Sequence, residues 1–305
     1  MVFFGIDTSC YTTSFAAVDL EGRLLEDRRL PLRVPAGGRG LRQSEMVFQH
    51  VKHMGRLAVE AREPVGAIAV SAAPRPQKDS YMPVFAVSDS FGRAIAAATG
   101  ARLYPLTHQH GHIGAAMFQR DVDGDFLGIH VSGGTTDVLL VSAREGIIEE
   151  IRQLGQTSDI AAGQLIDRIG VRLGISFPCG PGLEAMAGGE PLLLKSSVKG
   201  MCASFSGAET AAERLLAQGE SPAAVALSVQ KCVAKTLEKL IVNARRSTGV
   251  EQALLFGGVM CNQYIKDFLN GRLDGLAFAE KRFASDNACG LAMQARNRFL
   301  QENRA

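Results

Sequence analysis

An internal repeat limits the folds that this sequence can adopt. Residues 126–141 read FLGIHVSGGTTDVLLV, in which two apolar runs flank a turn of Ser, Gly and Thr residues, the pattern of a β-hairpin. Subtracting 123 from each residue number superposes this stretch on the N-terminus without a gap. The residues that then meet an identical residue include Gly128, Ile129, Ser132, Thr135, Thr136, Val141, Glu149 and Arg152, which fall on Gly5, Ile6, Ser9, Thr12, Thr13, Val18, Glu26 and Arg29. So many matches in one frame indicate a duplicated lobe, far longer than a solenoid repeat.

Each copy of the repeat places a polar turn between two strands. Glycines let backbone N–H groups turn outward together, and the hydroxyls of Ser9 and Ser132 add donors, so such turns can hold phosphate oxygens. Strands come first in each half and alternate with helices afterwards, which predicts an α/β fold with mixed sheets. We expect an N-terminal lobe over 1–122 and a C-terminal lobe over 123–305, with the final helix free to pack back on the first lobe. A nucleotide would bind between the lobes.

Composition excludes several classes of protein. The 305 residues carry a formal net charge of +2, which gives no global attraction for nucleic acid. The sequence has no apolar run of membrane length and no CxxC pair, and its start, MVFFGID, lacks the basic residues of a signal peptide. We therefore expect a cytoplasmic protein with free thiols and no membrane contact. Basic residues outnumber acidic ones in one stretch of the first lobe, which predicts either a local nucleic-acid face or a solvated surface. They are Arg23, Arg28, Arg29, Arg33, Arg39, Arg42, Lys52, Arg56 and Arg62.

Apolar spacing predicts the principal helices. One helix follows Ser44, a long one begins near Ser221-Pro222, and a last one begins around Asp286. The core-facing residues expected in the first are Val47, Val51, Met54 and Ala58, and in the second Val225, Val229, Val233, Leu237 and Ile241.

The sharpest local feature is the sequence HQHGH at 108–112. His108 and His112 are four residues apart, so at a helix start they would lie on one face and could share a metal ion. The alternative is that they only form hydrogen bonds at the helix start. Asp286 follows a strand and is placed like a third ligand. Because Gln109 stands where a zinc peptidase carries its general-base Glu, and no plausible nucleophile triad is visible, we expect no peptidase activity.

Several further residues are candidates for binding or catalysis. Asp7 and Asp137 lie next to the two repeated turns, where their carboxylates could orient magnesium or water near phosphates; ordinary turn aspartates are the alternative. Asp159 and Asp167 lie eight residues apart on an expected helix and could meet one ligand. Gly257 and Gly258 follow a strand, where a base or ribose could pack on bare backbone, and Asn262 would cap the next helix.

Taken together, these motifs resemble a known family, the tRNA threonylcarbamoyladenosine synthases, formerly called glycoproteases or O-sialoglycoprotein endopeptidases. The resemblance covers nearly the whole chain and depends on the order of the motifs. They are GIDTSCYTTS at 5–14, HQHGH at 108–112, VSGGTTD at 131–137, DIAAGQLIDR at 159–168, FPCGPGLE at 177–184, FSG at 205–207, GGVMCN at 257–262 and SDN at 285–287.

The resemblance implies two RNase-H-like lobes of the actin/Hsp70/sugar-kinase (ASKHA) superfamily, with an active site in the interlobe cleft. It implies one iron or zinc ion held by His108, His112 and Asp286. It also implies ATP or threonylcarbamoyl-adenylate as the nucleotide ligand, held by Ser132, Gly133, Gly134, Asp167, Gly180 and Asn262. The implied reaction transfers the threonylcarbamoyl group to the adenosine beside the tRNA anticodon. The implied partners are tRNA and the accessory subunits of that pathway, with a paralogous ASKHA protein as a candidate.

This sequence departs from the family pattern on what would be the acceptor side. Tyr11-Thr12 replaces an acidic pair, Thr135 replaces a frequent His, and the Gly-Pro-Gly loop has become Ala72-Ala73-Pro74-Arg75-Pro76, at the start of the loop 72–83. His110 and Gln164 replace Glu, and Cys179 replaces Gly. The alternatives are therefore a paralogue that keeps the nucleotide and the metal but acts on another acceptor, and a non-catalytic scaffold of the modification complex.

Overall fold

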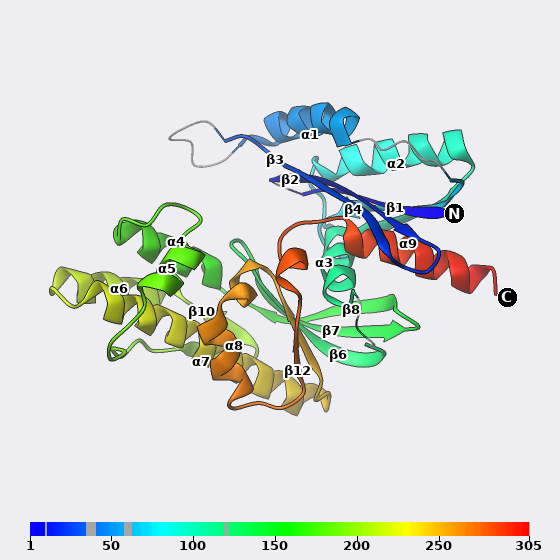
Figure 1. The fold of residues 1–305 in the computed structure, drawn as a ribbon. Coiled ribbons are helices and arrows are strands. Elements are labelled where there is room, and N and C mark those ends of the chain that lie inside the picture. Colours follow the sequence, from blue (N-terminus) through cyan, green and yellow to red (C-terminus); the bar gives the residue numbers. More distant parts are fainter. Residues whose placement is uncertain (10, 35–40, 58–62, 119, 121, 305) are drawn as a thin grey trace. The chain divides into compact units, whose positions relative to one another are not determined.

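The computed structural model describes residues 1–304 apart from 10, 35–40, 58–62, 119 and 121, and the chain divides into two units (Figure 1). Unit 1 comprises 1–124, 143–149 and 285–305, and unit 2 comprises 125–142 and 150–284. The first lobe expected from the sequence, 1–122, lies within unit 1, and the last helix packs on this unit, an arrangement that the expected division had left open. Unit 1 also takes in a segment at 143–149, which the sequence had assigned to the second lobe.

Unit 1 is a five-stranded sheet with helices on both faces. Its strands run in the order β3-β2-β1-β4-β5, antiparallel from β3 to β1 and parallel from β1 to β5. Figure 1 shows α1 and α2 on one face, and α3 and α9 on the other. The bounds are β1 (Val2–Thr8), β2 (Thr12–Asp19), β3 (Leu24–Pro31), α1 (Gln43–Leu57), β4 (Val65–Ala73), α2 (Phe85–Thr99), β5 (Arg102–Thr107), α3 (His108–Ala116) and α9 (Cys289–Glu302).

Unit 2 repeats this sheet, in the order β12-β11-β6-β7-β8. Here β6 takes the place of β1, and β11 is parallel to both β6 and β12. The strands are β6 (Gly124–Val131), β7 (Thr136–Arg144), β8 (Ile147–Gln156), β9 (Ser197–Lys199), β10 (Cys202–Ser204), β11 (Ala253–Phe256) and β12 (Leu276–Phe278). The helices are α4 (Ala162–Arg172), α5 (Gly180–Met186), α6 (Ser206–Ala217), α7 (Pro222–Thr248), α8 (Gln263–Asn270) and the short turns η1 (Gly258–Cys261) and η2 (Lys281–Phe283). The duplicated sheet order confirms the α/β fold with mixed sheets.

The long helix α7 supports unit 2 with the stripe expected from its sequence. Val225, Val229, Val233, Leu237 and Ile241 are all fully buried in the main core cluster. Residues spaced three or four apart lie on one helical face, so this stripe faces the core cluster, which also contains residues of β6, β7 and β11. Among the described residues, no helix combines the length and the hydropathy needed to cross a bilayer.

Helix α1 buries two histidines beside the apolar residues that its sequence suggested. Val51 is 47% exposed, and Ala58 lies outside the described residues. The buried residues include His50 and His53, because the Thr13 hydroxyl on β2 lies 2.8 Å from Nδ1 of His50 and 3.0 Å from Nδ1 of His53. A buried polar group satisfied in this way can replace an apolar one. Of the core-facing residues expected for α1, Met54 is buried and Val47 packs against the core, whereas the expectation for Val51 was wrong.

The burial of His50 predicts a loss of stability in acid. Burial lowers the pKa of His50 to about 4, while an unfolded histidine titrates near 6.5. Below about pH 6.5 the unfolded chain binds a proton at His50, whereas the folded chain does not bind it until about pH 4. The free energy of unfolding therefore falls between about pH 6.5 and pH 4. The loss is on the order of 2–3 kcal/mol.

Urea unfolding from pH 7.5 to 4.5 of the wild type and of His50→Gln would test this. The amide keeps a hydrogen-bonding group for Thr13 but does not titrate, so its stability should fall less steeply over this range. All other ionisable groups are common to both proteins and cancel in the difference. Identical slopes would show that His50 is not held neutral.

Candidate functional site

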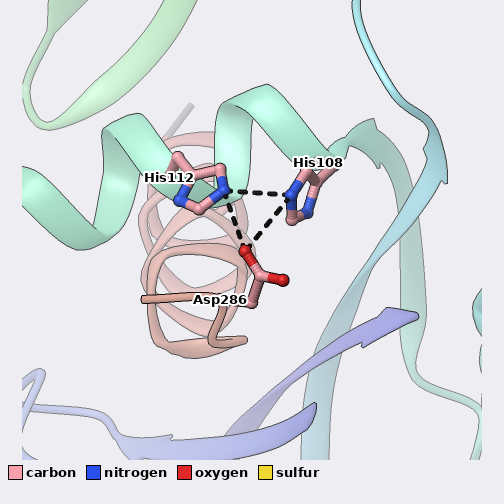
Figure 2. Close-up of side chains that lie close together, drawn as sticks. All are labelled: His108, His112 and Asp286. Atoms are coloured by element: carbon pink, nitrogen blue, oxygen red, sulfur yellow. Dashed lines mark hydrogen bonds and ion pairs between the residues drawn. The ribbon is translucent and has the colours of Figure 1, made fainter. Parts of the chain in front are cut away.

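The candidate metal triad, formed by His108, His112 and Asp286, lies wholly within unit 1. Thr107 caps the N-terminus of α3, where its hydroxyl accepts a hydrogen bond from the His110 backbone, so the helix begins at His108 and places His112 one turn later. Asp286 precedes α9, which packs against α3. Figure 2 shows the two imidazoles and the carboxylate pointing toward one another. The structure therefore brings Asp286 to two histidines that lie 174 or more positions earlier in the chain.

The distances in the triad suit a tetrahedral metal ion. His112 Nε2 lies 2.9 Å from His108 Nε2 and 3.4 Å from Asp286 Oδ1, and His108 Nε2 lies 3.7 Å from Asp286 Oδ1. Ligand bonds of about 2.1 Å in a tetrahedron separate the donor atoms by about 3.4 Å. Two imidazoles and one carboxylate are a donor set of iron and zinc sites, and three protein ligands leave a position open.

The electrostatics of the triad also favour a bound cation. Burial alone would lower the pKa of His108, but the charges of Asp7 and Asp286 and the hydrogen bond to Asp7 raise it to about 9. Burial likewise raises the pKa of Asp286, yet the hydrogen bond from His112 and the two imidazoles hold it well below its usual range. The site thus stabilises positive charge at the point that the three ligands share.

His110, between the two ligands, is not part of the triad. Its Nδ1 lies 2.7 Å from the Thr107 hydroxyl, and burial, with help from Arg298, lowers its pKa to about 4.

The Ser132–Gly134 turn of unit 2 offers exposed backbone to a ligand. The turn is closed by a hydrogen bond from Ser132 N to Thr135 O at 2.8 Å. Gly163 of α4 packs directly on it, since a Cβ there would lie 2.4 Å from Ser132 O. By contrast, Cβ atoms on Gly133, Gly134, Gly180 and Gly258 would meet nothing within 4 Å. These four positions are open, as a phosphate or ribose cradle requires.

Gly257 has a different role from its neighbour Gly258. Its φ of 100° is in the left-handed region, and a Cβ there would lie 2.3 Å from Val131 O, at the end of β6. Glycine at 257 therefore lets β11 turn tightly beside the Ser132–Gly134 turn, while Gly258 leaves the backbone uncovered.

Asn262 is held by two hydrogen bonds within the protein. Its Oδ1 accepts from the backbone N–H of Ile265, which confirms it as the N-cap of α8, and its Nδ2 donates to Gln230 Oε1 at 2.8 Å. Gln230 is fully buried on α7, and the sequence reasoning missed it. The sequence signal that could have identified Gln230 is a glutamine among the apolar residues of the long helix.

The two aspartates at 159 and 167 do not lie on one helix, which corrects the sequence expectation. Asp159 lies before α4 and accepts hydrogen bonds from the hydroxyls of Ser204 and Ser206 and the N–H groups of Phe205 and Ser206. It therefore caps α6. Asp167 is on α4 and accepts from Cys179 N at 2.8 Å, and burial raises its pKa.

Three other candidates sit near the repeated turns. Asp137 is buried on β7, where Gln153 Nε2 lies 3.3 Å from its Oδ1. In unit 1, Asp7 Oδ1 lies 2.8 Å from His108 Nδ1, and the Ser9 hydroxyl lies 2.7 Å from Asp286 Oδ2. Asp7, at the end of β1, and Ser9, in the turn after it, therefore each contact a residue of the candidate metal triad.

The arginine-rich stretch of unit 1 is more neutralised than its sequence suggests. Arg23 pairs with Asp19 and Glu21, Arg28 with Glu26, and Arg29 with Asp27. Arg39 and Arg62 lie outside the described residues. Elsewhere in unit 1, the loop after β4 lines a hollow of about 470 Å³ and exposes Tyr81 by 73%. This loop also touches the start of α3, where Gln109 N donates to Pro74 O.

Comparison with known proteins supports one family. The sequence model described as "tRNA N6-adenosine threonylcarbamoyltransferase" matches residues 63–293. A protein of that name from Dehalococcoides mccartyi is 30% identical over 98% of this chain and 94% of its own length. A "probable bifunctional tRNA threonylcarbamoyladenosine biosynthesis protein" from Methanothermobacter thermautotrophicus is 31% identical over 88% of this chain. The chain spans about half the length of the bifunctional relatives.

Solved structures of this fold include nucleotide complexes. A glucokinase of the ROK family from Streptomyces griseus, with glucose and AMPPNP, matches 97% of this chain and 99% of its own at a TM-score of 0.54 and 13% identity. This likeness confirms the ASKHA-type fold.

Proposed function

Because the chain belongs to the tRNA N6-adenosine threonylcarbamoyltransferase family, we propose that it transfers the threonylcarbamoyl group from threonylcarbamoyl-adenylate to the adenosine beside the tRNA anticodon. The observation that carries this proposal is the His108–His112–Asp286 triad, whose donor atoms converge on one point. It would act in the cytoplasm with the accessory subunits of the pathway. A peptidase lacks support, because Gln109 holds the position of the general-base Glu.

The proposed reaction is an acyl transfer in which one bond forms and one breaks at the carbamoyl carbon. The exocyclic N6 amine of adenosine attacks the carbamoyl carbon, a C–N bond forms, and the bond from that carbon to the phosphate oxygen breaks. AMP leaves with the electron pair, and the amine gives up a proton. An iron or zinc ion held by His108, His112 and Asp286 would supply Lewis-acid polarisation or anchor a phosphate.

The residues of unit 2 would bind and orient the adenylate. The open backbone at Ser132, Gly133 and Gly134 would donate N–H groups to phosphate oxygens, which also stabilises the negative charge of the leaving group. Asp167, on α4, would accept from ribose hydroxyls, and Gly180 and Gly258 would leave room for the sugar and the base. In this proposal Asn262 fixes the backbone of Gly258–Cys261 by capping α8. Magnesium remains a candidate near Asp137.

A second candidate function is transfer to another acceptor by a divergent paralogue. It is favoured by the altered acceptor-side residues, Tyr11 and Thr135, and by the loop after β4, which exposes Tyr81 and adjoins the first turn of α3. The metal and nucleotide residues would keep the same roles in either case.

Reconstitution with labelled threonylcarbamoyl-adenylate, tRNA and the accessory subunits tests the proposal. The wild type should carry close to one iron or zinc ion and label tRNA. His108→Ala and Asp286→Ala should lose the metal and lower the transfer rate at least 100-fold, because each removes one of three ligands. Arg93→Ala, which removes an exposed ion pair with Asp89, is the control. If the wild type binds metal and adenylate but does not label tRNA, this proposal is wrong. The second candidate function, transfer to another acceptor, would then replace it.

A further inference from the structure

The end of β1 contacts the metal triad at two places. Asp7, 1% exposed, lies with Oδ1 at 2.8 Å from His108 Nδ1, while His108 Nε2 faces His112 and Asp286. A carboxylate only accepts hydrogen bonds, so Nδ1 carries the proton and donates it to Asp7. The lone pair of a neutral His108 then lies on Nε2, at the point shared by the three ligands.

Ser9 contacts the carboxylate of the triad, Asp286, and fixes its orientation. Its hydroxyl lies 2.7 Å from Asp286 Oδ2 and 3.2 Å from Thr12 O. The backbone N–H of Ser9 already donates to Thr12 O, so the hydroxyl proton is available for the charged and closer acceptor. This bond occupies Oδ2 and leaves Oδ1 toward the histidines, 3.4 Å from His112 Nε2.

The second oxygen of Asp7 points to the same role. Asp7 Oδ2 is buried and has no hydrogen-bond partner among the residues that the structure describes. A buried carboxylate with so few partners is costly unless positive charge lies close by. A cation bound to His108 Nε2 would supply that charge across a single imidazole ring.

We propose that Asp7 is a positioning residue of the metal centre, which fixes the orientation and the tautomer of His108, and that Ser9 orients Asp286 in the same way. This inference rests on the proposed metal site. It replaces the expectation that Asp7 orients magnesium near phosphates. Partners of this kind change metal affinity by about 10- to 100-fold in other proteins.

Metal affinity tests the role of Asp7 directly. Zn²⁺ would be titrated into metal-free protein against a competing chelator, and Co²⁺ would report the coordination geometry through its visible spectrum. Asp7→Ala should weaken Zn²⁺ binding about 10- to 100-fold and change the Co²⁺ spectrum, because His108 can then rotate and change tautomer. Asp7→Asn should recover part of the loss, since its amide oxygen still accepts from Nδ1.

Thr8→Val is the matched control for a purely structural effect. Thr8 is the next residue of β1 and is equally buried, but its hydroxyl bonds to Val84 O and Ser88 and not to the triad. It should destabilise the protein without changing Zn²⁺ affinity. Zn²⁺ binding within twofold of wild type in Asp7→Ala, or an equal loss in Thr8→Val, would overturn the inference. A wild type that binds no metal would instead overturn the metal site itself.

Discussion

Replacing Gly290 with alanine is expected to lower the free energy of unfolding by about 3 kcal/mol and to strip the metal. A Cβ on Gly290 would lie 2.0 Å from Gly111 O and 2.2 Å from Ala115 N, both backbone atoms of α3. Backbone cannot move aside as a side chain can, so α9 must move away from α3. Because α3 carries His108 and His112, and Asp286 lies just before α9, one added methyl group separates the ligands.

Urea unfolding and elemental analysis of the purified variant would measure both effects. Gly55→Ala is the control, since Gly55 lies in α1 of the same unit and a Cβ there meets nothing within 4 Å. It should be neutral or stabilise by up to about 1 kcal/mol, because alanine favours the helix. Wild-type stability and metal content in Gly290→Ala would contradict the close crossing of α3 and α9.

The second large effect is expected at the glycines of unit 2. Gly133→Val and Gly258→Val should abolish nucleotide binding and leave the protein folded, because each added side chain occupies open space and not protein. For the wild type, a nucleotide at 100 times its Kd adds about 2.7 kcal/mol of stability, which raises Tm by a few degrees. That rise should vanish in both variants.

Thermal unfolding with and without ATP measures the difference. Gly188→Val is the matched control, since its Cβ has only Ala223 Cβ at 4.0 Å and Gly188 lies outside the candidate cradle. It should keep the full shift. A shift that survives in both Gly133→Val and Gly258→Val would place the nucleotide elsewhere.

The sequence predicts those features that depend on local pattern or on the repeat. The duplicated strand–turn–strand predicts two similar sheets, and the spacing of His108 and His112 predicts two ligands on one face. Contacts made over long sequence distances could not be predicted. Asp159 caps a helix that begins 47 residues later, and Thr13 draws His50 and His53 into the core. Neither arrangement produces a periodic pattern in the local sequence from which it could be predicted.

The placement of α9 has a consequence for synthesis of the protein. It covers the face of β1 and β4, where Gly5 packs on Ala288 and Ala292 and the ring of Phe3 lies 5.4 Å from that of Phe299. At about 5–20 residues per second, the ribosome needs roughly 10–30 s to make the chain between α3 and α9. During that time one apolar face of the nascent first sheet is uncovered. His108 and His112 on α3 are then without Asp286. The candidate metal triad is therefore complete only after translation has passed Asp286, the last of its three residues in the chain.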